Sequence, residues 1–387
     1  MKNEILRISI LIFSVRKGLK DQSFYKLFEE ILVNCPKLTS LQFATDNLRS
    51  DDYSWENPGL KAEDYMPNDY QYLQALGNLN HLENVNITCN NMSTFVRDFT
   101  LPPSVKNVKL SLPSFEPSSM FLREDSKSSE VFLNFCEKWS HLTNLKTLNL
   151  AFYQLCDPGG STVKFLRPWL KRIHHIQNLK LELSSEDSTP YPWRLSARQR
   201  SFDLSGFFEL IQHLKSTLKT LALSDNGLIY SLKNLPKEPL GFDSLEKLSL
   251  QGFMLPEKFS LSQLLQVNLK DLLEKNEQHK PFELILEGLY FDSMGSFVDF
   301  MKNFDHEGSQ ERRFVKMKMT VYVRLKESHT SQSDIRSQYF TIESKSLRIQ
   351  LQVVGNEKFD ELGNNPKILL RNNLKSFKVQ KEIGSGS

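Results

Sequence analysis

The side chains that most often carry out catalysis or hold metal ions are scattered along this sequence. Its eight histidines include one close pair, His174-His175, but adjacent helix residues diverge by about 100° and cannot chelate one ion. Carboxylates such as Asp51-Asp52 would act as acid and base only if a pocket brought them together. The sequence also lacks a glycine-rich phosphate loop and the common hydrolase and metalloprotease motifs. We therefore expect a protein that is not an enzyme and uses no metal or cofactor.

A basic and aromatic pattern near the C-terminus is the main candidate for a binding site. Lys316, Lys318, Tyr322 and Arg324 alternate with valines and methionines, which predicts a long strand with one basic face. Further basic residues at outward strand positions are Lys247, Arg348 and Lys378. These residues predict docking of an acidic protein segment. The alternative is a solvated strand face whose lysines keep a sheet edge soluble.

Aromatic residues in two insertions form a second candidate contact set. Trp55 lies in the segment 51–69 and Trp193 in the segment 184–200, and both segments contain prolines and several polar residues. Tryptophan and tyrosine are common anchors of protein interfaces, so these segments are candidate contacts. Local packing of each insertion onto the body of the protein is the alternative.

The cysteines and the apolar segments indicate the compartment. None of Cys35, Cys89, Cys136 and Cys156 belongs to a C-x-x-C pair, and each lies in or beside an apolar segment. Reduced, buried thiols in a cytoplasmic protein are expected, with a disulfide between two of them as the alternative. No stretch reaches the ~18 apolar residues of a membrane span, and Arg16-Lys17 stands where a signal peptide would have its cleavage site.

An apolar pattern, L-x-x-L-x-L, recurs along the chain. Seven copies begin at Leu38, Leu82, Val105, Leu145, Ile176, Leu218 and Leu245, and shorter copies occur at Leu6–Ile10, 284–286, 315–319, 347–351 and 374–379. The alternating L-x-L part predicts a short strand with one buried face, which neighbouring strands must cover. Helical spacing of apolar residues marks the segments 24–32, 131–139, 165–173 and 207–214.

These repeats resemble the leucine-rich-repeat family, in the longer, helix-containing style of ribonuclease inhibitor. The family motif continues to an asparagine, which this chain matches at Asn226 and Asn90 and lacks in most other copies. The resemblance implies an α/β fold, a curved solenoid with parallel strands on the concave face and helices on the convex face. It would run as one domain over residues 1–383, with about 11–12 coils and a linker-like tail at 384–387. In the family the asparagine ties one coil to the next, so its loss predicts irregular stacking.

A preformed curved surface without catalytic groups favours a non-catalytic scaffold that binds a protein partner, and an acidic one suits the basic strand. Two alternatives stay open. One is nucleic-acid binding through the basic C-terminal coils, and the other is the substrate-recognition arm of a ubiquitin ligase, although no F-box-like segment precedes the first strand. The missing N-terminal cap favours a place in a longer chain or a larger assembly, because open repeat ends expose apolar surface.

A salt titration tests the nucleic-acid alternative. If the basic C-terminal coils bind phosphates, affinity for generic RNA or DNA should be measurable at low salt and should fall steeply as salt is added. Charge reversal at Lys316, Lys318, Arg348 and Lys378 should abolish it. An absence of measurable affinity at low salt would contradict this alternative.

Overall fold

The computed structural model describes the repeat strands and the segments that lead into them. The described residues are 10–15, 30–45, 76–88, 100–112, 137, 139–153, 167, 170–184, 201–226, 231–233, 242, 244–255, 283–291, 294–308, 316–324, 336–343, 348–355, 366–375 and 378–381. The chain divides into two compact units. Unit 1 comprises Met1–Asp157 and Lys164–Glu186, and unit 2 comprises Pro158–Val163 and Asp187–Ser387.

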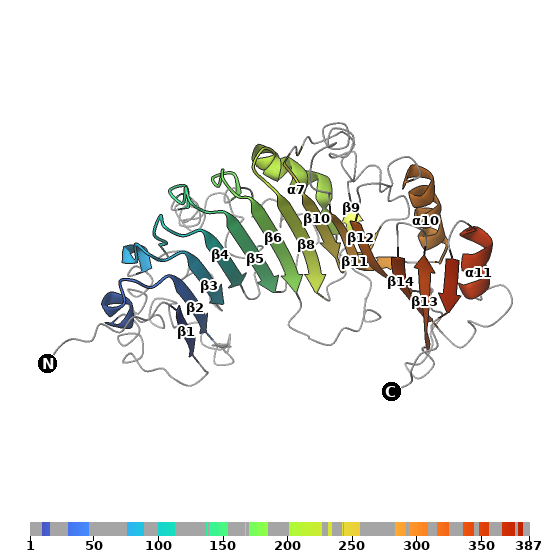
Figure 1. Ribbon diagram of the computed structural model, residues 1–387, viewed down its shortest axis with the longest axis horizontal. Helices are drawn as coiled ribbons and strands as arrows, with labels where there is room; N and C mark the ends of the chain where they lie inside the picture. The colour runs from blue at the N-terminus through green and yellow to red at the C-terminus, as the bar shows by residue number, and fades with distance from the viewer. Residues whose placement is uncertain are drawn as a thin grey trace, which may run out of the picture. The chain divides into compact units, whose positions relative to one another are not determined.

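Unit 1 contains a parallel sheet whose described strands follow one another in sequence order (Figure 1). They are β1 (Ile10–Val15), β2 (Ser40–Thr45), β3 (Asn84–Thr88), β4 (Asn107–Leu112), β5 (Thr147–Tyr153) and β6 (Asn178–Ser184). Each pairs in parallel with the next. Each of β2 to β6 lies on one predicted L-x-x-L-x-L copy, so this part of the repeat prediction is confirmed.

The apolar residues of unit 1 meet in register from strand to strand. Leu41, Val85, Val108, Leu148 and Leu179 form one continuous row of partners. All five are buried, with at most 3% of their surface exposed. No register shift interrupts the described strands of this unit, whereas the stacking of whole coils stays a prediction.

The described part of the first strand pairs with β2 further along the chain than the sequence pattern predicted. Leu11 pairs with Leu41 and Phe13 with Phe43, so β1 carries its repeat at Ile10–Val15 rather than at Leu6–Ile10. Ile10 to Phe13 are all apolar, so the sequence allows either set of alternate residues to face the core. A shift of one residue in strand pairing exchanges the two sets. Pairing with β2 places Leu11 and Phe13, rather than Ile8 and Ile10, at the register positions of Leu41 and Phe43.

Tight turns lead into β2, β3, β4 and β5 and extend the repeat toward its N-terminal side. The N–H group of the first repeat residue donates to a carbonyl three residues earlier, as in Leu38 to Cys35 at 3.0 Å and Leu145 to Leu142 at 3.1 Å. Such bonds give about three residues per turn, so side chains three apart stack on one side. Buried apolar residues accordingly precede the repeats at Leu32, Cys35, Leu76, Leu79, Trp139, Leu142, Leu170 and Ile173. Leu76–Asn78 forms the 3₁₀ helix η2.

A recurring backbone contact links successive repeats. The Thr39 carbonyl accepts hydrogen bonds from the N–H groups of both Glu83 and Asn84, at 2.9 and 3.0 Å. The carbonyls of Glu83, Lys106, Lys146 and Lys219 receive the same pair of bonds from the following repeat. The turn that opens each repeat is therefore tied to its neighbour before the strand begins.

Unit 2 contains a mixed sheet rather than a parallel one. Its strands are β8 (Thr220–Asn226), β10 (Lys247–Gln251), β11 (Glu283–Phe291), β12 (Lys316–Arg324), β13 (Arg336–Glu343), β14 (Arg348–Gly355) and β15 (Lys378–Lys381). From β8 through β10, β11 and β12 to β14 the pairs are parallel. β13 then lies antiparallel between β14 and β15. The all-parallel prediction is wrong here, and β13 was not predicted.

A second, two-stranded sheet and three helices complete the described part of unit 2. β7 (Ser201–Asp203) pairs in parallel with β9 (Ser231–Lys233). The helix α7 spans Leu204–Ile211, followed by the 3₁₀ helix η4 (Gln212–Leu214), which confirms the helical spacing at 207–214. The helices α10 and α11 span Met294–Gly308 and Pro366–Asn373.

Phenylalanines fill the core of unit 2. Phe202 lies 5.6 Å from Phe207 and 5.9 Å from Phe253 between ring centroids. Phe291 contacts two rings of α10, Phe297 and Phe300, each at 5.4 Å. All six are buried, and tilted or edge-to-face rings at these separations pack favourably.

A β-bulge at Gly288 keeps the apolar residues of β11 on one side. Leu286 pairs with Met319, but the next apolar pair is Leu289 with Val321, so β11 holds one extra residue. Gly288 has a φ of +61°, which favours glycine because it has no Cβ. The extra residue changes the phase of alternation, and Leu286, Leu289 and Phe291 are all buried as a result.

Helix α7 depends on a side-chain cap. Asp203 Oδ1 accepts a hydrogen bond from the Gly206 N–H at 3.0 Å. Replacing Asp203 by alanine should lower the free energy of unfolding by about 1 kcal/mol, because the N–H loses its partner. Asp203→Asn keeps an acceptor and should lose much less. Urea denaturation of the three proteins measures both values, and equal losses would contradict the capping role.

Candidate partner-binding face

The polar surface of the unit 1 sheet is made by the residues that alternate with the buried ones. We call it the outward face and divide it into rows of register partners on β2 to β6. The entry row is Ser40, Asn84, Asn107, Thr147 and Asn178, and the central row is Gln42, Asn86, Lys109, Asn149 and Lys180. Neighbours in a row are separated by the strand spacing of about 4.8 Å. The face is therefore a regular array of amides, hydroxyls and ammonium groups.

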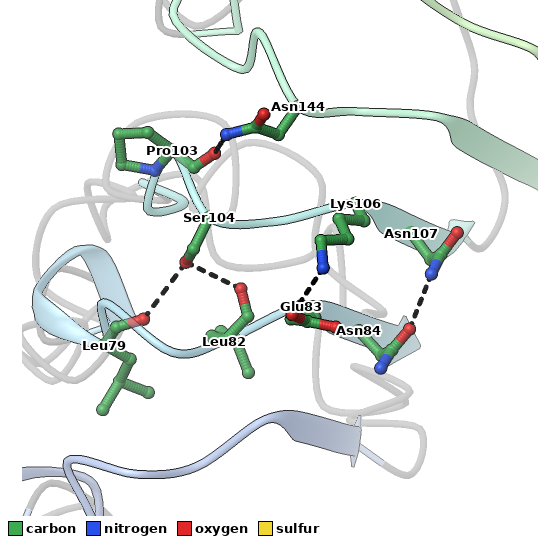
Figure 2. Close-up of polar contacts among 9 residues, drawn as sticks. All are labelled: Leu79, Leu82, Glu83, Asn84, Pro103, Ser104, Lys106, Asn107 and Asn144. Carbon is green, nitrogen blue, oxygen red and sulfur yellow. Dashed lines mark hydrogen bonds and ion pairs between the residues drawn. The ribbon is translucent and has the colours of Figure 1, made fainter.

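Hydrogen bonds within the sheet occupy much of the entry row (Figure 2). The Asn107 amide donates to Asn84 Oδ1 at 2.7 Å, and the Asn178 amide donates to Thr147 Oγ at 3.3 Å. Beside the first pair, Lys106 forms an ion pair with Glu83, and both side chains are more than 40% exposed. The entry row is thus partly consumed by contacts that hold neighbouring strands together.

Polar side chains ahead of the strands bind the backbone of the preceding repeat. Ser104 Oγ donates to the Leu82 carbonyl at 2.8 Å, and the Asn144 amide donates to the Pro103 carbonyl at 2.9 Å (Figure 2). In unit 2, Ser244 Oγ makes the equivalent bond to the Ser216 carbonyl at 2.7 Å. These residues directly precede the first apolar residue of a repeat. They link consecutive repeats in a chain that lacks most of the motif asparagines.

The central row differs from the entry row, because among the described residues most of its polar side chains form no hydrogen bond or ion pair with a neighbour. Lys180 forms an ion pair with Glu182 at 2.9 Å. Within the described part of the chain, Lys109 is exposed without an ion pair. Asn149, between Lys109 and Lys180 in register, has a buried Oδ1 that finds no hydrogen-bond partner among the described residues. A buried acceptor without a donor costs about 1–3 kcal/mol.

The structure distributes the predicted basic residues over four strands of unit 2. Lys247 lies on β10, where it is half-buried, and Lys378 is exposed on β15. Lys316, Lys318, Tyr322 and Arg324 lie on β12, as the predicted strand requires, and Arg348 begins β14. Trp55 and Trp193 lie outside the described residues, as do Cys89, Cys136 and Cys156.

Carboxylates stand between several of these basic residues in the register. Glu283 is the partner of both Lys247 and Lys316, and Glu343 is the partner of both Arg348 and Lys378. Glu283 and Glu343 therefore share register rows with four of the predicted basic residues, whereas Lys318 and Arg324 have Ile285 and Val354 as register partners. The acidic partners were missed because they occur in other segments of the chain.

Tyr322 shares its register row with other polar and aromatic residues. Tyr290 pairs with Tyr322, Tyr322 with Gln352, and Gln352 with Tyr339. Tyr339 is 43% exposed, which is unusual for so large a side chain. The sequence pattern identified Tyr322 alone, because the row requires knowledge of β13.

The described residues contain a free thiol and no cluster of metal-binding side chains. Among the described residues, no group of three or more His, Cys, Asp or Glu side chains could hold a metal ion. Cys35 is buried with a free thiol. Of the helices that the structure describes, none combines the length and apolar character that a membrane crossing requires.

A double-mutant cycle separates the two contacts that join β3 to β4. Alanine at Asn84 and Asn107 should reveal a coupling of about 1 kcal/mol that changes little with salt. The exposed pair of Glu83 and Lys106 should couple by less than about 0.5 kcal/mol, and added salt should weaken it. Urea denaturation at two salt concentrations gives both values. A larger coupling energy for Glu83 and Lys106 than for Asn84 and Asn107 would contradict this prediction.

The sequence was compared with models of known protein families and with curated proteins, and neither comparison finds a match.

Proposed function

We propose that this chain is a leucine-rich-repeat-like solenoid that acts as a non-catalytic scaffold and binds a protein partner across its outward face. The in-register parallel strands of unit 1 support the repeat assignment, and so do the short turns that open each repeat. A cytoplasmic location fits the free, buried thiol of Cys35.

The asparagines of the central row carry this proposal. Asparagine is disfavoured in strands, where β-branched and aromatic residues fit better. Asn84 and Asn107 compensate by bonding to each other, but within the described residues Asn86 and Asn149 have no such contact. Residues that weaken a strand without an internal role are expected where a surface makes contacts with another molecule.

The geometry of the face favours a protein over a small ligand. The central row presents polar side chains at a regular spacing, on strands whose backbone is hydrogen-bonded to a neighbouring strand on each side. Such an array can contact many groups of a large partner without rearrangement, which keeps the entropic cost of binding low. A few anchors in the row would then supply most of the affinity.

Site-specific photo-crosslinking tests this proposal. A benzophenone amino acid at Gln42 or at Lys109, both exposed on the central row, should label the same partner in a native extract. Val33 is 67% exposed, lies in the helical turn ahead of β2 and serves as the control position. An excess of unlabelled wild-type protein should compete the product away. Equal labelling of the same partner from Val33 would contradict binding through the outward face.

A further inference from the structure

We infer that the partner presents an extended acidic segment to the outward face of unit 1, centred on Asn149 and flanked by Lys109 and Lys146. This inference rests on the proposed function and adds the chemistry of the partner to it. It is argued from two lysines that have no ion-pair partner among the described residues, and from the Asn149 side-chain oxygen, which has no hydrogen-bond partner among them.

Internal ion pairs leave two ammonium groups on this part of the sheet. Lys106 is paired with Glu83, and Lys180 with Glu182. Lys109 and Lys146 are both exposed, and among the described residues neither has an ion-pair partner. Lys146 immediately precedes β5, and Lys109 lies on β4 opposite Asn149. The two uncompensated charges therefore lie on β4 and directly ahead of β5, on either side of the entry row.

Asn149 adds a requirement for hydrogen-bond donors. Its Oδ1 is buried and has no partner in the described part of the chain, but the residue as a whole is half-buried, so turning the amide toward a bound N–H would remove an energetic cost. An asparagine side chain can accept from a main-chain N–H and donate to a main-chain carbonyl at once. An extended peptide supplies both groups along its backbone. Glutamate or aspartate side chains on that peptide would reach Lys109 and Lys146.

Nucleic acid fits this face less well than an acidic peptide does. Glu83 and Glu182 lie among the lysines, so the face lacks the continuous basic path that a phosphate backbone requires. A peptide places its carboxylates individually and can avoid both. Binding of nucleic acid is therefore one of the outcomes that the test distinguishes.

The test measures the binding of a fluorescein-labelled, glutamate-rich peptide to the full chain by fluorescence anisotropy at low and moderate salt. Lys109→Glu with Lys146→Glu should weaken binding at least about tenfold, since two attractions become repulsions. The matched control is Lys37→Glu with Lys171→Glu, which reverses two exposed lysines outside the strands and should have little effect. If the first double variant does not fold, glutamine at the same two positions replaces it.

Asn149→Val separates recognition from a purely structural role. Removing a buried unpartnered acceptor and adding a strand-forming residue should leave the melting temperature unchanged or raise it. Peptide binding should nevertheless weaken. Unchanged peptide binding by this variant would overturn the role of Asn149.

Three further results would overturn the inference. They are an absence of peptide binding by the wild-type chain, equal loss in both charge-reversed variants, and tighter binding of a generic RNA that Lys109→Glu with Lys146→Glu abolishes. In the first case, continued crosslinking from Gln42 and Lys109 would leave the proposed function standing with a partner of different chemistry. If selective crosslinking from Gln42 and Lys109 were lost as well, both the inference and the proposed function would be contradicted.

Discussion

Each strand from β2 to β6 has one apolar face that it cannot bury by itself, and the rest of unit 1 follows from that constraint. A buried leucine contributes about 1.5–3 kcal/mol when its neighbours cover it. Leu148, for example, reaches full burial only because Val108 and Leu179 lie beside it in register. Backbone bonds then hold the opening turn of one repeat against the next. The outward positions take no part in this burial, so their composition is free to serve recognition.

The sequence pattern predicted the repeats of unit 1 because burial of one strand face requires apolar residues at alternate positions of the strand. The apolar pattern places β2 to β6 and the helix around Phe207 correctly. It misplaced β1, where consecutive apolar residues allow two phases, and it missed β13. Phe340, Thr341 and Ile342 are all buried, so β13 lacks the alternation that marks a strand with one exposed face. Its antiparallel pairing on both sides also follows from contacts between distant segments.

The candidate site was harder to predict, for a related reason. Charge counting along the chain marks the C-terminal coils as basic, but register decides which charges are neighbours. Glu283 and Glu343, on other strands, are the register partners of four of these basic residues. Conversely, Lys109, Asn149 and Lys180 are unremarkable in their own segments and become one row only when β4, β5 and β6 are paired. A short sequence window contains no information of this kind.

The tight turns ahead of the strands also constrain how this protein can evolve. From Leu32 through Cys35 and Leu38 to Leu41, every third residue is buried on one side. A single inserted residue in that stretch would rotate the remaining side chains toward water and break the contact with the next repeat. Insertions between one strand and the following turn have no such effect. Gene duplication can therefore copy whole repeats and vary their connections, while the segment from turn to strand tolerates substitution but not changes of length.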